Sequence, residues 1–168
     1  MNNQEKNLYV RGQLLHTLLD MMTTQPFDSI SVSDLAQRSG VGRASFYRNY
    51  TSKEDILQQE SARLMRAWGG CLQGDTPEAY SRALISFLDF IKEHGTFYLA
   101  LYDARMERVL QDAVISQFHM PDQAPNEIAY RFHSLAYTLF GWIDAWIRRG
   151  MPESGAQLAQ MFANAQLH

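Results

Sequence analysis

The chain has 168 residues, with 15 lysines and arginines against 18 aspartates and glutamates, a net charge of −3. This acidic balance excludes a protein whose whole surface binds polyanions without specificity, and it leaves only a local basic site open. The single cysteine, Cys71, excludes an internal disulfide framework and fits a reducing, cytoplasmic location. No stretch approaches the roughly 18 uninterrupted apolar residues of a membrane span, and the polar start of the chain lacks a secretory signal.

Helix signals follow one another from the start of the chain. Apolar residues recur at helical spacing from Asn7 to about Met22, and Pro26 then prevents the helix from continuing. A second helix is predicted after Ser31, whose hydroxyl can accept a hydrogen bond from the amide three residues later. Gly40 suits the left-handed residue that closes this short helix. These signals predict two helices separated by a short loop.

The stretch 31–53 has the length and the charge of a DNA-binding helix-turn-helix. A tight turn follows Gly40, and a short third helix is predicted at Arg43–Asn49. No acidic residue lies between Asp34 and Glu54. The charged side chains in this acid-free gap are all cations, namely Arg38, Arg43, Arg48 and Lys53. Positive potential is therefore expected at this site although the whole chain is acidic.

Proline and glycine divide the rest of the chain into further predicted helices, and no stretch alternates in the manner of a strand. These segments are Ser52 to Trp68 or Cys71, Pro77 to His94, the short aromatic segment Phe97–Tyr102, Met106 to Phe118, Asn126 to Arg149, and a last helix from Pro152. The sequence therefore predicts an all-α protein of about nine helices. We expect an N-terminal three-helix domain with the helix-turn-helix at residues 1–52 and a C-terminal helical bundle domain at residues 53–168.

The predicted helix Asn126–Arg149 carries two apolar stripes, one through Leu135 and Trp142 and one through Ala136 and Ile143. A helix that is apolar on two sides is buried on two sides. One side can face the core of its own chain, whereas the other side needs a partner.

Large aromatic side chains are frequent in the second half of the chain. They can line a cavity for an apolar or aromatic ligand, or they can simply fill a packed core. The candidate pocket residues are Trp68, Phe87, Phe90, Tyr98, Tyr102, Phe132 and Tyr137.

No pattern of an enzyme or a metal site is present in the sequence. His94, His119 and His133 do not form a metal-binding spacing with nearby Cys, Asp or Glu residues. The chain also lacks a glycine-rich phosphate loop, a nucleophile elbow and a recognisable pair of carboxylates. We therefore expect no catalytic residues, no metal and no cofactor.

A set of residues in and around the helix-turn-helix matches a known family. The set comprises Val32, Leu35-Ala36, Gly40-Val41, Ser45-Phe46-Tyr47, Tyr50 and the stretch 52–57. These residues resemble the TetR family of bacterial transcriptional regulators. Together with the preceding helix, the resemblance covers about a third of the chain. A shorter likeness at 141–154 is similar to the C-terminal domain of one branch of that family. Three positions depart from the usual pattern of the family. Gly42 lies where the family often has a capping Ser or Thr, Asn49 replaces a frequent His, and Tyr50 replaces a frequent Phe.

The resemblance implies a homodimer that binds a palindromic operator, and a pocket for an inducer or signal in the C-terminal domain. It also implies that the last two helices of each chain form a four-helix interface. The interface residues expected on these helices are Leu135, Leu139, Trp142, Trp146, Leu158 and Phe162.

The resemblance places DNA contacts on the third helix and its surroundings. Family positions that match Tyr47 and Lys53 contact phosphates, and those that match 43–45 lie at bases or nearby phosphates. Arg43 can pair with the N7 and O6 atoms of a guanine or with a phosphate, and both options stay open. The candidate DNA-binding residues are Ser33, Arg43, Ala44, Ser45, Tyr47, Arg48, Asn49 and Lys53.

These observations together predict a TetR-like, DNA-binding transcriptional regulator. We expect a repressor that a small apolar or aromatic effector releases, because a protein seated on an operator blocks polymerase without further contacts. The alternative is an activator or co-activator whose C-terminal domain binds a partner protein. An adaptor with a vestigial helix-turn-helix agrees less well with the acid-free gap.

Overall fold

The structure is a computed structural model that describes residues 3–68, 76–116 and 123–165. Within these ranges all regular elements are helical, which confirms the predicted all-α fold. The nine α-helices and one 3-10 helix (η1) are α1 (Asn3–Met22), η1 (Phe27–Ser29), α2 (Val32–Ser39), α3 (Arg43–Asn49), α4 (Lys53–Trp68), α5 (Pro77–Glu93), α6 (Gly95–Asp103), α7 (Glu107–Ser116), α8 (Asn126–Arg148) and α9 (Gly155–Ala165).

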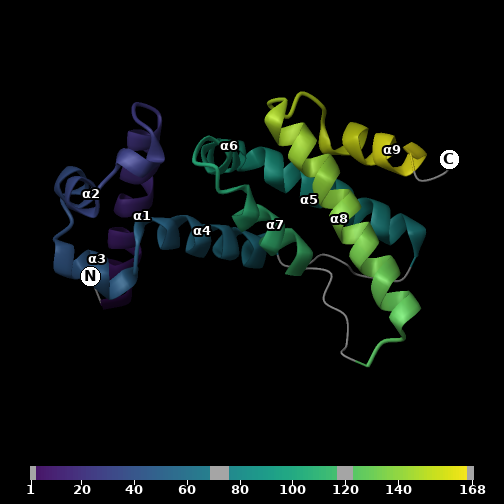
Figure 1. The fold of residues 1–168 in the computed structure, drawn as a ribbon, viewed down its shortest axis with the longest axis horizontal. Coiled ribbons are helices and arrows are strands. Elements are labelled where there is room, and N and C mark those ends of the chain that lie inside the picture. Colours follow the sequence, from purple (N-terminus) through teal and green to yellow (C-terminus); the bar gives the residue numbers. More distant parts are fainter. Residues whose placement is uncertain (1–2, 69–75, 117–122, 166–168) are drawn as a thin grey trace.

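The helices form two groups that α4 joins (Figure 1). α1, α2 and α3 pack on one another at one end of the molecule, and α5, α8 and α9 lie at the other end. α6 touches α1, and α4 packs on α7. The division into two domains at residues 52 and 53 stays a prediction, and the structure offers α4 as the connection between the two groups. None of the described helices combines the length and apolarity that a bilayer span requires.

The first helix anchors the N-terminal group with three side chains spaced by four and three residues. Leu14, Leu18 and Met21 have at most 1% of their surface exposed. α1 begins at Asn3, earlier than the predicted start at Asn7. The side chains 4–9 are exposed, so no apolar periodicity in the sequence marks these first turns.

The second group is held by α5, α8 and α9. Thr76 caps α5 by accepting a hydrogen bond from the Ala79 amide, and Pro77 occupies the first turn, as predicted. α9 approaches α5 so closely that the Gly155 amide donates to Asp89 Oδ1 at 2.9 Å. A Cβ atom at position 155 would collide with the Asp89 carboxylate, so this contact requires glycine.

Several predicted helix boundaries differ from the structure, and α6, predicted at Phe97–Tyr102, is longer at both ends. α8 ends at Arg148, one residue before the predicted end, and the backbone amide of Arg149 caps it by donating to the Ala145 carbonyl. α9 begins at Gly155 after Ser154, whose hydroxyl accepts from the Gln157 amide at 3.3 Å. The predicted residues Cys71, Phe118 and His119 lie outside the described ranges.

Candidate nucleic-acid interface

The helix-turn-helix is held by the local capping chemistry that its sequence predicts. Ser31 Oγ accepts from the Asp34 amide at 3.0 Å and donates to Asp34 Oδ2 at 2.6 Å, which starts α2. Gly40 has a φ of 67°, a left-handed value that glycine adopts without strain. Val41 is buried in the turn, and its amide donates to the Ala36 carbonyl at 3.1 Å. The turn therefore fixes the angle between α2 and α3.

The short helix α3 has one buried face and one face open to solvent. Phe46 is fully buried and Tyr50 is 5% exposed, so these two rings attach α3 to the core. Arg43, Ala44 and Tyr47 are exposed, and Tyr47 keeps 55% of its surface accessible. A helix that enters a major groove needs this combination of small residues and hydrogen-bond donors on its outer face.

Three other predicted DNA-contact residues on α3 bond to one another. Arg48 Nη2 donates to Ser45 Oγ at 2.7 Å, and Asn49 Nδ2 donates to the Ser45 carbonyl at 2.8 Å. The side chains of Ser45 and Asn49 are half-buried, whereas that of Arg48 is exposed. Gly42 offers no side-chain cap at the start of α3, as its departure from the family pattern implied. Arg48 therefore retains donors for a phosphate, while Ser45 and Asn49 also stabilise the helix itself.

Lys53, the last predicted phosphate contact, has a role inside the protein. Its Nζ atom donates to the Phe27 carbonyl at 2.6 Å and to the Ile30 carbonyl at 2.9 Å. The same ammonium lies 4.4 Å from the centroid of the Phe27 ring. Two of its three hydrogen-bond donors are thus occupied, and they join the start of α4 to the loop before α2.

We predict that Lys53→Met lowers the free energy of unfolding by about 2 kcal/mol, because two carbonyls lose a charged donor and the Phe27 ring loses its cation. Urea denaturation measures this change. Lys6→Met on exposed α1 surface is the matched control and should leave the denaturation midpoint unchanged. Equal midpoints for the two variants would contradict the structural role and leave Lys53 free for DNA.

Two exposed residues of α2 extend the candidate interface beyond the predicted set. Gln37 lines one open hollow together with Ser33 and Arg43, which brings predicted contacts of α2 and α3 around one depression. Arg38 lies beside Gln37 in a neighbouring hollow and is exposed. In the sequence, Arg38 could be recognised as a candidate for the interface because it lies in the acid-free gap. Gln37 has no such signal, because an uncharged polar residue on a helix surface is common.

The seven predicted pocket aromatics divide between the surface of α8 and the interior of the described chain. Phe132 and Tyr137 are 41% and 53% exposed on α8. The other five are buried or half-buried, and they are Trp68, Phe87, Phe90, Tyr98 and Tyr102. The Trp68 and Phe87 rings contact each other, with centroids 4.7 Å apart, and the choice between a pocket and a packed core stays a prediction.

Two tyrosines of α6 differ in how their hydroxyls are satisfied. Tyr102 donates to Asp144 Oδ1 at 2.9 Å, and the Arg148 guanidinium lies over its ring and bonds the other oxygen of Asp144 at 3.0 Å. Tyr98 is fully buried, and within the described ranges its hydroxyl has no hydrogen-bond partner. Burial raises the pKa of both hydroxyls, so both stay neutral at physiological pH.

The predicted interface side chains divide between the surface and the core of one chain. Leu135 is 41% exposed, and Trp142 is half-buried with its ring perpendicular to that of Phe162. Four of the six are already buried within the chain, namely Leu139, Trp146, Leu158 and Phe162. A buried side chain contributes little new area to an interface. The accessible part is an open groove along α8 and α9, lined by Thr138, Gly141, Trp142, Ala145, Trp146, Arg149, Glu153, Leu158 and Met161.

No metal-binding group emerges from the described ranges, where His, Cys, Asp and Glu side chains never gather in threes or more. His94 packs against the Phe90 ring with centroids 4.5 Å apart, and His133 is exposed on α8.

Comparison with known proteins supports this interpretation of the N-terminal group. The family model described as bacterial regulatory proteins, tetR family, matches residues 14–59, which run from α1 to the middle of α4. No curated protein sequence matches the chain.

Three solved structures share the fold over most of the chain. Lin0861 from Listeria innocua has a TM-score of 0.77 and 17% identity, covering 99% of this chain and 93% of that one. The dihydroxyacetone kinase operon activator DhaS has a TM-score of 0.59 and 18% identity, covering 94% of both chains. A tetR-family transcriptional regulator from Streptomyces coelicolor has a TM-score of 0.55 and 20% identity, covering 98% of this chain and 81% of that one.

The matched segment contains the capped helix-turn-helix and its exposed α3 face, and the three solved structures share the fold of the second group as well. The N-terminal helices therefore form a DNA-binding domain of the TetR family of bacterial regulatory proteins.

Proposed function

We propose that this protein is a cytoplasmic homodimeric regulator that binds a palindromic operator through two copies of α3. The observation that carries the proposal is the exposed face of α3. Arg43, Ala44, Tyr47 and Arg48 are all exposed there, and Phe46 holds the helix from behind. Arg43 would meet a base or a nearby phosphate, and Tyr47 and Arg48 would meet phosphates, which fix register without reading sequence.

The second copy is expected to dock on the groove of α8 and α9. Its lining combines small exposed residues, Gly141 and Ala145, with the larger Trp142 and Met161. Small residues let two helices approach closely, and the large ones supply apolar area. A dimer spaces two copies of α3 about 34 Å apart, one turn of DNA, which makes a short and weakly charged site specific.

For the sign of regulation we propose repression, relieved by a small apolar effector in the second group of helices. A protein seated on an operator excludes polymerase without any further contact. The effector must bind the DNA-competent and the released state with unequal affinity, since only such a ligand shifts their populations. Tyr98 is a polar candidate contact, because its buried hydroxyl has no partner within the described ranges.

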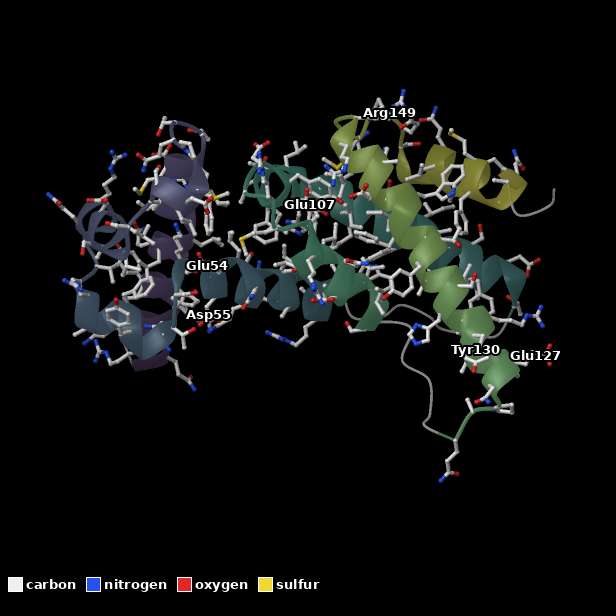
Figure 2. All side chains as sticks on the ribbon, in the orientation of Figure 1. Glu54, Asp55, Glu107, Glu127, Tyr130 and Arg149 are labelled. Carbon is white, nitrogen blue, oxygen red and sulfur yellow. The ribbon has the colours of Figure 1, made fainter. Side chains whose placement is uncertain are left out.

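An activator that binds a partner protein is the second candidate, and a surface feature favours it. The first half of α8 exposes large apolar side chains along an open hollow, and Figure 2 shows Tyr130 near the start of that helix. The exposed side chains are Ile128, Tyr130, Phe132, Leu135 and Tyr137. The similar protein DhaS is itself described as an operon activator. Transcription in vitro from a promoter with this operator separates the two candidates, because a repressor lowers transcript and an activator raises it.

Binding to the DNA upstream of the protein's own gene tests the proposal. Three exposed arginines per copy, Arg38, Arg43 and Arg48, give six in a dimer. If all six neutralise phosphates, the logarithm of the association constant falls with the logarithm of salt with a slope of about −5. Affinity measured by fluorescence anisotropy should then drop about 10³-fold between 50 and 200 mM salt.

A triple variant, Arg38→Gln, Arg43→Gln and Arg48→Gln, is the control and should flatten the slope toward zero. A flat response of the unchanged protein on every tested upstream fragment would contradict the DNA-binding function.

A further inference from the structure

The direction of α3 depends on what holds its final turn. α3 has seven residues, too few for a helix that is stable without neighbours. Phe46 and Tyr50 bury one face, but apolar burial is not directional. The last carbonyls of a helix lack partners within the helix, so a donor that binds them can set its orientation.

Gln59, in the second turn of α4, supplies such a donor. Its Nε2 atom donates to the Asn49 carbonyl at 3.3 Å and to Asp55 Oδ1 at 3.0 Å. Its Oε1 atom accepts from Arg11 Nη2 at 2.8 Å. Arginine can only donate and carbonyl oxygens can only accept, so these partners fix the orientation of the Gln59 amide. One side chain therefore bonds to α1, to the end of α3 and to α4.

Charged groups complete the network on both sides of Gln59. Arg11 Nε donates to the Tyr50 hydroxyl at 3.3 Å, and its guanidinium lies 5.6 Å from the centre of that ring. Asp55 Oδ2 accepts from the Thr51 amide at 2.8 Å and from the Thr51 hydroxyl at 3.2 Å. Burial by itself would raise the pKa of the Asp55 carboxyl, but the hydrogen bonds from Thr51 and Gln59 outweigh it and lower the pKa.

Asp55 thus stays ionised at neutral pH and remains an acceptor for Gln59. Figure 2 labels Asp55 at the start of α4. The network spans a sequence separation of 48 residues between Arg11 and Gln59, so it joins elements that the chain itself does not keep together.

We propose that Gln59 is a positioning residue for the recognition helix, one that fixes the end of α3 to α4 and so couples the direction of α3 to that of α4. The inference rests on the proposed DNA-binding function, since positioning of α3 matters there for operator recognition. A shift of α4 relative to α1 would stretch the bonds of Gln59 to Arg11 and to Asn49 together. Because three elements meet at one amide, a movement of α4 alone would strain the bond that holds the end of α3.

The test replaces Gln59 with methionine, which keeps length and helix propensity but cannot form these hydrogen bonds. Gln58→Met is the matched control, because Gln58 is the adjacent residue of α4 and is exposed. The first readout is amide hydrogen exchange of residues 43–52 in the full-length protein without DNA. Exchange there should be about fivefold faster in Gln59→Met, the loss expected from one neutral hydrogen bond. Gln58→Met should exchange at the rate of the unchanged protein.

The second readout is DNA affinity. Gln59→Met should weaken operator binding about tenfold and change binding to random DNA less than twofold, because only specific readout needs a fixed pose. A second variant, Gln59→Glu, keeps an acceptor for Arg11 and loses the donor to Asn49 and to Asp55. It should reproduce the faster exchange of residues 43–52 if the bond to α3 is the relevant one.

The outcomes separate this inference from the proposed function. Unchanged exchange at 43–52 in both Gln59 variants overturns the positioning role, even if the protein binds its operator. Faster exchange spread equally over α1 to α4 also overturns it, because that result is general loosening. If exchange rises locally while no DNA is bound by the unchanged protein, Gln59 still positions α3 and the DNA-binding proposal fails.

Discussion

Replacing Phe46 with alanine is expected to lower the free energy of unfolding by about 3–5 kcal/mol. The Phe46 ring has no exposed surface, and it is the only fully buried side chain that α3 contributes among those described. Its removal leaves a cavity between α3 and the helices behind it, and only the end of this seven-residue helix is then still held, by Tyr50 and Gln59. Domains of this size are stable by about 5–15 kcal/mol in total, so the variant should be largely or partly unfolded at 37 °C. Urea denaturation followed by circular dichroism measures the change.

Tyr47→Ala on the next position of α3 is the control for this prediction. The Tyr47 side chain is 55% exposed, so its loss should change the free energy of unfolding by about 0.5 kcal/mol or less. Binding to DNA should nevertheless weaken, on operator and random sequences alike, because a phosphate contact carries no sequence information. If Phe46→Ala is as stable as Tyr47→Ala, α3 is not anchored as the structure describes.

Replacing Ala145 with glutamate is expected to weaken the homodimer about 10²- to 10³-fold. Ala145 is exposed in one chain and lines the groove of α8 and α9, so the single chain should tolerate the longer side chain. In the proposed dimer the new carboxylate would be buried without a partner, which costs several kcal/mol, typically about 3–5. Sedimentation equilibrium gives the dimer dissociation constant. Operator affinity should fall in parallel, because one copy of α3 offers few contacts.

Ala67→Glu is the matched substitution outside the groove. Ala67 is exposed on α4, and its replacement should leave both the dimer and its operator affinity unchanged. A dimer that withstands Ala145→Glu would move the interface away from this groove. The exposed first half of α8, around Tyr130, would then be the next surface to change.

The elements that sequence alone predicted are those whose stabilising contacts are local. Ser31 reaches an amide three residues away, and Gly40 adopts its left-handed conformation within a single turn. Such contacts depend on residues that are adjacent in the chain, so the helix-turn-helix and its boundaries follow directly from the order of the amino acids.

Hydrogen-bond partners that are distant in the sequence could not be predicted, because no local pattern marks them. Lys53 fits the pattern of a phosphate contact, yet its ammonium bonds to carbonyls 23 and 26 residues earlier. Gln59 carries no pattern at all, because a glutamine on a helix is ordinary until Arg11 and the end of α3 are placed beside it. The sequence shows the donors, whereas only the fold shows where the acceptors lie.

Helical periodicity also leaves open what covers an apolar face. The stripe of α8 that contains Leu135, Leu139 and Trp146 is continuous in sequence. In the structure Leu139 and Trp146 are buried inside their own chain, whereas Leu135 is 41% exposed. α6 and α7 pack against α8. The part of α8 that they cover is therefore buried within a single chain, without a second copy. Periodicity cannot distinguish these two halves, because both halves satisfy the same spacing.

Because Lys53 and Gln59 both tie the first turns of α4 to the N-terminal helices, α4 acts as a lever arm with the DNA-binding group fixed to one end. α4 has 16 residues and is therefore about 24 Å long. A rotation of about 5° around its far end displaces the attached group by about 2 Å, by simple geometry on that length. In a dimer two such displacements in opposite directions change the spacing of the recognition helices by about 4 Å, against the roughly 34 Å turn of DNA. In the proposed dimer, a rotation of α4 that also shifts α1 against α6 would therefore move both recognition helices relative to their half-sites.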